Sequence, residues 1–261
     1  GLNSPNPPIG LAYLAGVLEN DDIEYSVIDM TGEGIDKVRR LEARKDIWVI
    51  GLDNAEVLER ISENTDIIGI SCMFSMHWPL VRSLVRSIRE KFPYVTIIAG
   101  GEHISALPEF VLKESEIDIA VIGEGEEILP ELVDTIRNES NLESVNGISY
   151  IDKGNIIKTK SQVRVKDIDK ICWPCWDKFP IMKYISSNLQ NGVNLGRSMP
   201  MVATRGCPFD CTFCSNPQMW GKSHVVRNPR DIVEEMKKYI KSYNVTNFNF
   251  QDLTAFVKRT W

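Results

Sequence analysis

The stretch at residues 201–214 reads MVATRGCPFDCTFC and holds three cysteines, Cys207, Cys211 and Cys214, at C-x3-C-x2-C spacing. The apolar run at residues 201–204 predicts a strand that ends at this cysteine loop. Three thiolates on one short loop can ligate three irons of a cubane cluster and leave the fourth iron without a protein ligand. Because a substrate or cofactor can coordinate an open metal position, the spacing predicts chemistry rather than a passive structural site.

The residues that follow indicate a β-α-β unit. Asn228 and Pro229 are typical of a helix N-cap followed by proline at the first helical position. The next strand is predicted at residues 245–250. The predicted apolar face of the helix consists of Ile232, Val233, Met236, Ile240 and Tyr243. The cysteine loop then lies at the carboxyl end of a parallel strand, where barrel-type sheets place their active sites.

Upstream, alternating strand and helix patterns predict a doubly wound, parallel-sheet α/β domain of the flavodoxin or Rossmann type over residues 1–140. Predicted strands are 23–29, 67–72, 95–99 and 117–122, and predicted helices are 9–18, 79–91, 106–114 and 126–137. The stretch at 47–52 is ambiguous. Residues 141–196 are predicted to form a hairpin, at 145–159, and then an irregular connector.

The cysteine motif and its flanks resemble the radical S-adenosylmethionine (SAM) superfamily. The resemblance rests on ATRG at 203–206, the cysteine triplet and Phe213 just before the last cysteine. It implies that the open iron of a [4Fe-4S] cluster binds SAM, and that the reduced cluster cleaves SAM to a 5′-deoxyadenosyl radical. It also implies that residues 197–261 form the first third of a partial (β/α)6 barrel. Phe213 and Asp252, within FQDLT at 250–254, are then predicted SAM-side residues.

The front domain resembles the cobalamin-binding domain that precedes many radical SAM cores. The matching stretches are PPIGLAYL at 7–14, GGEHIS at 100–105 and GEGE at 123–126. In an open parallel sheet the ligand lies outside the carboxyl ends of the strands. The predicted cobalamin-binding residues are therefore Asp29, Thr31, Gly34, Gly100, Gly101, His103, Gly123, Glu124 and Gly125.

One departure from the cobalamin-domain pattern concerns the lower cobalt position. Many such domains carry D-x-H-x-x-G, whose histidine takes that position, whereas residues 29–34 read DMTGEG and place Thr31 there. Because a threonine hydroxyl is a poor cobalt ligand, cobalamin would bind here without that histidine. Related cobalamin-dependent radical SAM proteins often lack it. A domain kept only as a scaffold is the alternative.

Composition excludes several other classes. The net charge of −6 argues against nucleic acid as the principal partner, and no apolar run reaches membrane-spanning length. Six cysteines, three of them in the cluster motif, favour a reducing cytoplasm over a disulfide framework. Both ends of the chain are expected to be cut from a longer protein. Cys172 and Cys175 form another C-x2-C pair without supporting ligands nearby, so packing is the expected role.

The leading functional prediction is a cobalamin-dependent radical SAM enzyme that methylates carbon or forms rings. Its substrate would be a small molecule, lipid, tetrapyrrole or peptide, and its electron donor a protein such as flavodoxin or ferredoxin. A radical SAM methylthiotransferase is an alternative, although its front domain carries three cysteines and this one has only Cys72. A non-catalytic iron–sulfur or cobalamin-binding module is another. A zinc knuckle that adds His224 is disfavoured, because paired C-x2-C or histidine ligands are missing.

Overall fold

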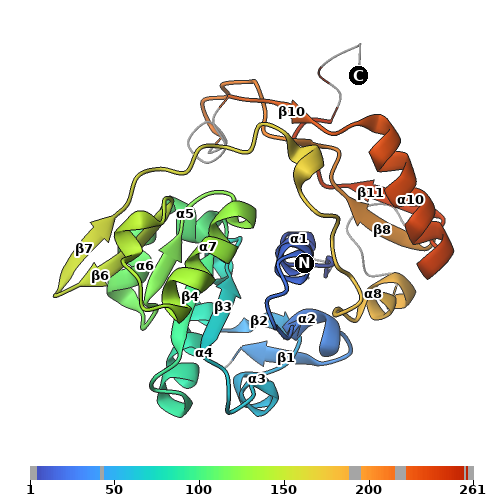
Figure 1. Cartoon of the computed structure of the whole chain (residues 1–261). Coiled ribbons are helices and arrows are strands. Elements are labelled where there is room, and N and C mark those ends of the chain that lie inside the picture. The colour runs from blue at the N-terminus through green and yellow to red at the C-terminus, as the bar shows by residue number, and fades with distance from the viewer. Residues whose placement is uncertain (1–4, 42–43, 188–194, 215–221, 256, 258–261) are drawn as a thin grey trace. The chain divides into compact units, whose positions relative to one another are not determined.

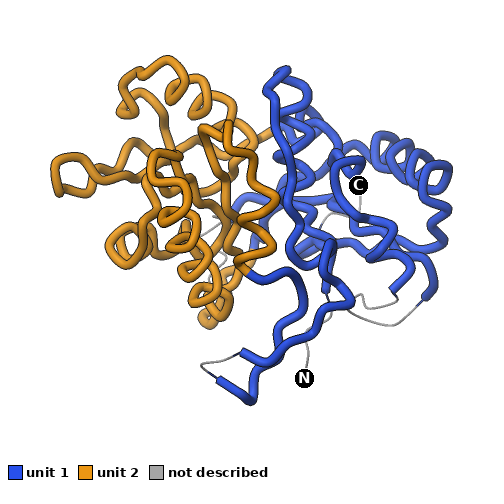
Figure 2. Tube along the Cα trace, turned by 90° about the horizontal axis from the view of Figure 1, so that it is seen from below, with its two compact units in different colours: residues 1–53, 167–208, 222–261 blue, residues 54–166, 209–221 orange. Residues whose placement is uncertain are grey.

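The computed structural model describes residues 5–41, 44–187, 195–214, 222–255 and 257. The chain divides into two compact units (Figure 2). Unit 1 comprises Gly1–Asp53, Asp167–Pro208 and Lys222–Trp261, and unit 2 comprises Asn54–Lys166 and Phe209–Gly221. These units group residues by contact, and the predicted domain boundaries at 140 and 196 stay predictions.

Unit 2 is built on a five-stranded sheet in the order β3-β4-β5-β6-β7 (Figure 1). Strands β3 (Ile67–Ser71), β4 (Thr96–Gly100) and β5 (Ile119–Val121) are parallel, whereas β6 (Ile148–Asp152) and β7 (Asn155–Lys158) form an antiparallel hairpin. The helices are α3 (Asn54–Arg60), α4 (Trp78–Lys91), α5 (Glu102–Ala106), α6 (Pro108–Glu114) and α7 (Gly125–Arg137). The predicted α/β class with a parallel sheet is confirmed, and so is the hairpin.

The apolar residues of β4 and β5 form the core of unit 2, which explains why these short segments become central strands. Ile98, Ile119 and Val121 are buried and pack against Ile128 and Leu132 of α7. The edge hairpin joins the sheet through β6, which pairs with β5 in antiparallel orientation. Strands that are apolar on both faces are typical of sheets covered by crossover helices.

Unit 1 contains three small strand pairs and several helices. The antiparallel pairs are β1 (Val38–Leu41) with β2 (Arg44–Ile50) and β9 (Thr204–Arg205) with β10 (Val225–Val226), and β8 (Ser198–Met201) runs parallel to β11 (Asn247–Phe250). The helices are α1 (Ile9–Asn20), α2 (Met30–Glu33), α8 (Ile181–Ser187) and α10 (Pro229–Tyr243). Short 3₁₀ turns lie at Ser75–His77 and Leu142–Ser144 in unit 2 and at Ile168–Lys170 in unit 1.

The predicted β-α-β unit is confirmed, because β8, α10 and β11 follow one another and the two strands are parallel. Asn228 caps α10 by accepting a hydrogen bond from the Arg230 N–H at 3.0 Å, and Pro229 is the first helical residue. The first strand ends at Met201, three residues earlier than predicted.

Two predictions about local structure are wrong: the strand at 23–29 and the apolar face of α10. Residues 23–29 form no strand, and the stretch near 47–52, which the sequence left ambiguous, contributes to β2. In α10, Val233 and Ile240 are exposed, whereas Glu235 and Tyr239 are buried. The buried face is therefore rotated from the apolar pattern, since Glu235 is paired inside the unit with the Arg227 guanidinium. Among the residues described, no helix is long and apolar enough to span a bilayer.

Candidate functional site

The cysteine loop follows β9 through Gly206, whose φ of +81° is a conformation that favours glycine. The Cys214 N–H donates to the Cys211 carbonyl at 3.0 Å, which closes a turn between these two predicted ligands. None of the six cysteines is in a disulfide. Cys211 and Cys214 are exposed, Cys207 is half-buried, and Phe213 is 92% exposed.

The three cysteines of the motif do not all belong to the same compact unit. Cys207 belongs to unit 1, whereas Cys211, Phe213 and Cys214 belong to the segment grouped with unit 2. Within the described ranges, no three Cys, His, Asp or Glu side chains are gathered as a metal site. The donor set is present and chemically suited to iron, and its arrangement around a cluster stays a prediction.

Asp252 is hydrogen-bonded to the backbone at the start of β9, just before the cysteine loop. Its carboxylate accepts hydrogen bonds from the Ala203 N–H at 3.1 Å, from the Thr204 N–H and from the Thr204 hydroxyl at 2.6 Å. This acid follows β11, so it links the ends of two segments in unit 1. Its predicted contact with SAM stays a prediction, and its observed contacts support the backbone just before Cys207.

Thr254, to which sequence reasoning assigned no role, contacts a predicted cluster ligand directly. Its hydroxyl donates to the Cys207 sulfur, with an Oγ1–Sγ distance of 3.1 Å. The Thr254 carbonyl oxygen lies 3.2 Å from Thr204 Oγ1 and 2.8 Å from His224 Nε2. The only signal in the sequence was its place two residues after Asp252.

The predicted loop at 29–34 forms the short helix α2 in unit 1, capped at its start by its own side chains. Asp29 Oδ1 accepts from the Gly32 N–H at 3.0 Å, and Glu33 Oε1 accepts from the Asp29 N–H at 3.0 Å. This reciprocal arrangement resembles a capping box, with the acid one residue later than in the usual motif. The Tyr184 hydroxyl of α8 also donates to Asp29 Oδ1, at 2.9 Å.

Burial raises the pKa of the Asp29 carboxyl, although the hydrogen bonds from Gly32 and Tyr184 oppose that shift. Thr31 is half-buried in the helix. Gly34 is demanded by packing, because a Cβ there would lie 2.6 Å from the Leu52 nitrogen. The observed contacts of this loop are therefore structural, and its predicted role in binding cobalamin stays a prediction.

In unit 2, hydrogen bonds tie together the loops at the carboxyl ends of β3, β4 and β5. The Cys72 N–H donates to the Gly100 carbonyl at 2.8 Å, and the Gly123 N–H donates to Ser105 Oγ at 3.0 Å. Gly101, with φ of +106°, lies against the Cys72 carbonyl, whereas a Cβ at Gly123 would meet open space. The structure thus brings Gly100, Gly101 and Gly123 to one edge of the sheet.

His103 is buried at this same edge. Its Nδ1 is 2.8 Å from Ser75 Oγ, and its ring lies 5.2 Å from the Trp78 ring. Burial lowers the pKa of the imidazole, which favours the neutral form. Its Nε2 is buried and has no hydrogen-bond partner among the residues described. A buried polar atom of this kind is compatible with a polar ligand at the carboxyl edge.

Glu124 and Gly125 start helix α7 just after the β5 loop. The Glu124 carboxylate is buried and accepts hydrogen bonds from the Val165 N–H at 3.0 Å and from Arg164 Nε at 3.3 Å. It therefore anchors the segment after β7 within unit 2. Its predicted contact with cobalamin, and that of Gly125, stay predictions.

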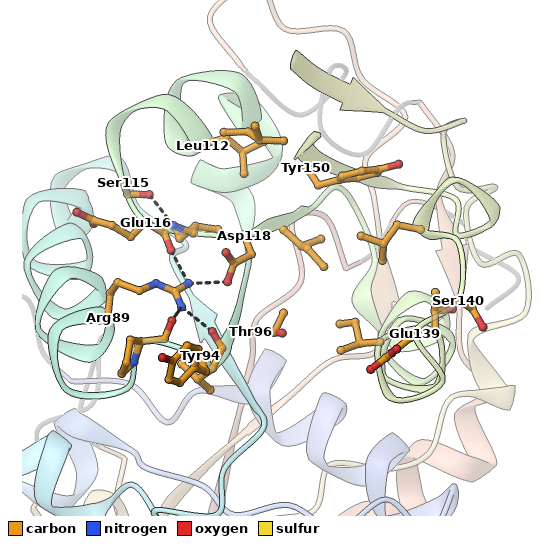
Figure 3. Close-up of a pocket in the computed structure, with 18 residues that line it drawn as sticks. Arg89, Tyr94, Thr96, Leu112, Ser115, Glu116, Asp118, Glu139, Ser140 and Tyr150 are labelled. Atoms are coloured by element: carbon orange, nitrogen blue, oxygen red, sulfur yellow. Dashed lines mark hydrogen bonds and ion pairs between the residues drawn. The ribbon is translucent and has the colours of Figure 1, made fainter. Parts of the chain in front are cut away.

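A groove of about 720 Å³ lies near the amino ends of β4 and β5, the sheet edge opposite these loops (Figure 3). Arg89 lies at its side and donates to the carbonyls of Pro93, Val95 and Glu116 and to the Asp118 carboxylate. Because these bonds already engage the guanidinium, Arg89 has a structural role there.

Two tests of fit follow from these contacts. For an iron–sulfur cluster, three thiols outside disulfides share one loop, and one of them already accepts a hydrogen bond. For cobalamin, the carboxyl edge of the unit 2 sheet has free space beside Gly123, where a Cβ would meet no atom within 4 Å. It also has the buried Nε2 of His103, which has no hydrogen-bond partner among the described residues. The residues present fit both groups.

Comparison with known proteins gives two matching family models. The B12 binding domain matches residues 2–133, and the radical SAM superfamily matches residues 201–258. The chain is 27% identical to an uncharacterized methyltransferase of Pyrococcus horikoshii, over 97% of this chain and 50% of that protein. It is 30% identical to the anaerobic magnesium-protoporphyrin IX monomethyl ester cyclase of Rubrivivax gelatinosus, over 97% of this chain and 42% of that protein.

Among solved structures, the chain resembles the cobalamin-dependent SAM radical enzyme OxsB with aqua-cobalamin and SAM bound. The TM-score is 0.75 at 18% identity, over 97% of this chain and 32% of that chain. This likeness concerns the fold. The chain spans about half the length of the first curated relative and 42% of the second. With one model covering half of its residues and the other covering the cysteine loop, the chain belongs to the B12-binding-domain proteins of the radical SAM superfamily.

Proposed function

We propose that this chain is part of a cobalamin-dependent radical SAM enzyme. The observation that carries the proposal is the C-x3-C-x2-C loop inside the radical SAM match, downstream of a B12-binding match on the same chain. The thiolates of Cys207, Cys211 and Cys214 would hold a [4Fe-4S] cluster and leave one iron open to SAM. When bound, the cluster supplies the electron that cleaves SAM, and cobalamin can carry a methyl group.

The chain's own residues would orient these groups. Asp252 and Thr204 hold the backbone that leads to Cys207, and Asp252 is the proposed SAM-side acid, with Phe213 on the cysteine loop. The unit 2 loops that contain Gly100, Gly101, His103, Gly123, Glu124 and Gly125 would face cobalamin, with the loop of Asp29, Thr31 and Gly34 as a further proposed contact. Thr31 predicts that cobalamin is held without a histidine at its lower position.

The reaction we propose is carbon methylation or ring formation. The similar proteins include both a methyltransferase and a cyclase, which supports this pair of outcomes. The substrate would be a small molecule, lipid, tetrapyrrole or peptide, and a flavodoxin or ferredoxin would supply electrons. Because the ligand thiols must stay reduced, we place the protein in the cytoplasm.

The first test is the iron and cobalt content of the full-length protein after anaerobic reconstitution with iron, sulfide and hydroxocobalamin. Close to four irons and one cobalt per chain is the expected result. Four irons without cobalt would mean that the front domain serves only as a scaffold, and the threonine at position 31 in place of a cobalt-binding histidine would be the reason. Absence of iron would overturn the proposal.

The second test uses matched cysteine variants. Cys207→Ala, Cys211→Ala and Cys214→Ala should each abolish cluster assembly, while Cys172→Ala and Cys175→Ala should leave the iron content unchanged. Full iron in any member of the first group would contradict the assigned ligands. Loss of iron in the second group would overturn the packing role of the connector cysteines.

A further inference from the structure

We propose that Thr254 is a positioning residue that tunes the reduction potential of the cluster through a hydrogen bond to the Cys207 sulfur. The inference rests on the proposed function, since it assumes that Cys207 is a cluster ligand. It concerns a side chain that lies outside the cysteine motif and 47 residues from its sulfur partner along the chain.

The geometry directs the Thr254 hydroxyl at the sulfur. The Oγ1–Sγ distance is 3.1 Å, and Thr254 is half-buried. The Thr254 carbonyl oxygen is 3.2 Å from Thr204 Oγ1 and 2.8 Å from His224 Nε2. These two contacts hold the Thr254 backbone from separate segments of unit 1, and the side-chain hydroxyl is left to donate to Cys207.

Hydrogen bonds also hold the backbone that leads to Cys207, the acceptor of the Thr254 hydroxyl. Asp252 accepts from the Ala203 and Thr204 backbone N–H groups, so the segment that leads to Cys207 is held against the segment that contains Thr254. The hydrogen bond thus joins two anchored backbones. Because the chain's own hydrogen bonds hold both segments, we expect the contact to persist when the sulfur binds iron.

The expected effect on the cluster follows from charge. A hydroxyl that donates to a ligand sulfur withdraws negative charge from it and stabilises the reduced, more negative state of the cluster. The Thr254 hydroxyl should therefore raise the midpoint potential. Since cleavage of SAM needs an electron from the reduced cluster, the residue would influence how readily the donor protein can reduce it.

The test is an EPR-monitored redox titration of the reconstituted full-length protein and its Thr254→Val and Thr254→Ser variants. Valine removes the hydroxyl at nearly constant volume, so the midpoint potential should shift to a more negative value with iron content unchanged. Serine keeps the hydroxyl and should restore the wild-type potential. Thr212→Val is the matched control, because Thr212 lies inside the cysteine loop and its exposed side chain makes no hydrogen bond to sulfur among the described contacts.

An unchanged potential in Thr254→Val at full iron content would overturn the inference while leaving the proposed function intact. A wild-type protein without iron would instead overturn the proposed function and the inference with it. If Thr254→Val takes up no iron, Thr254→Ser decides. Full iron at the wild-type potential in the serine variant supports the hydroxyl's role, and loss of iron there contradicts it.

Discussion

At the scale of single residues, two glycines at the carboxyl edge of the unit 2 sheet are required for different reasons, one for backbone conformation alone and one for close packing as well. Gly101 and Gly123 both have positive φ, at +106° and +94°. A Cβ at position 101 would lie 2.6 Å from the Cys72 carbonyl oxygen, whereas nothing lies within 4 Å of a Cβ at position 123. The requirement for glycine at 101 is therefore partly steric, and at 123 it is conformational.

This contrast predicts unequal losses of stability. Gly123→Ala should lower the free energy of unfolding by about 1 kcal/mol, since only the left-handed backbone is strained. Gly101→Ala should cost about 3 kcal/mol or more, because the backbone of Cys72 must also move. Urea unfolding followed by circular dichroism measures both. Equal losses would show that the close approach to Cys72 contributes nothing.

At the scale of secondary-structure elements, the side-chain cap of α2 also joins this helix to α8. Asp29 is the shared acceptor, since its Oδ1 receives both the Gly32 N–H and the Tyr184 hydroxyl. Burial raises the pKa of this carboxyl, and the neighbouring Glu33 adds to the shift. The ionised form is thus disfavoured in the folded state relative to the unfolded chain.

The sign of the pH dependence follows from this shift. Between the unfolded pKa, about 4, and the raised folded pKa, the native state binds more protons, so the contribution of Asp29 to stability falls as pH rises. Asp29→Asn keeps the Oδ1 acceptor and removes the titration. The stability of the wild type relative to Asp29→Asn should therefore decrease from pH 4 toward pH 7, measured by urea unfolding. A constant difference would contradict the raised pKa.

A second element-scale feature is the buried ion pair that holds α10. Arg227 Nη1 lies 2.6 Å from Glu235 Oε2, and both side chains are almost fully buried. Arg227 also donates to the Val202 carbonyl at 2.8 Å, and its N–H donates to the Ala203 carbonyl at 2.9 Å. The Tyr239 hydroxyl donates to Glu235 Oε1 at 2.6 Å. Helix α10 is thereby fastened to the strand end that precedes the cysteine loop.

Removing one partner of this pair should be costly. Arg227→Met leaves Glu235 buried without its cation, and breaking such a pair costs about 3–5 kcal/mol. Lys237→Ala, which removes an exposed pair with Glu234 on the same helix, should change stability by less than about 1 kcal/mol. Chemical denaturation of the two variants checks the contrast. Similar small losses would mean that the Arg227 contacts add little.

At the scale of the whole molecule, charge bears on the class of substrate. The chain carries 36 acidic against 30 basic residues, which gives a net charge of −6. A binding surface for tRNA depends on neutralising phosphates with lysine and arginine. We therefore expect no measurable binding to tRNA at physiological salt, as followed by fluorescence anisotropy. Salt-dependent binding at micromolar concentration would instead favour the methylthiotransferase alternative.

The difference between predicted and observed structure has a local physical origin. Parallel strands, the hairpin at 145–159 and the start of α10 were predicted correctly, because apolar runs, turn residues and a helix cap act over a few residues. Residues 23–29 carry an alternating pattern but pair with no strand, since pairing requires a partner edge that the pattern cannot specify. The apolar stripe of α10 likewise failed to reveal Glu235 as buried.

By itself, the sequence determined the family, and it predicts the cluster ligands because C-x3-C-x2-C is a local arrangement of thiol donors. Only the tertiary structure revealed that Thr254 reaches the Cys207 sulfur and that Arg227 and Glu235 pair inside unit 1. It also revealed that the Glu124 carboxylate and Asp29 Oδ1 accept hydrogen bonds from the chain's own groups. Those contacts join residues far apart in the chain. Such contacts arise from packing and burial, which no short pattern encodes.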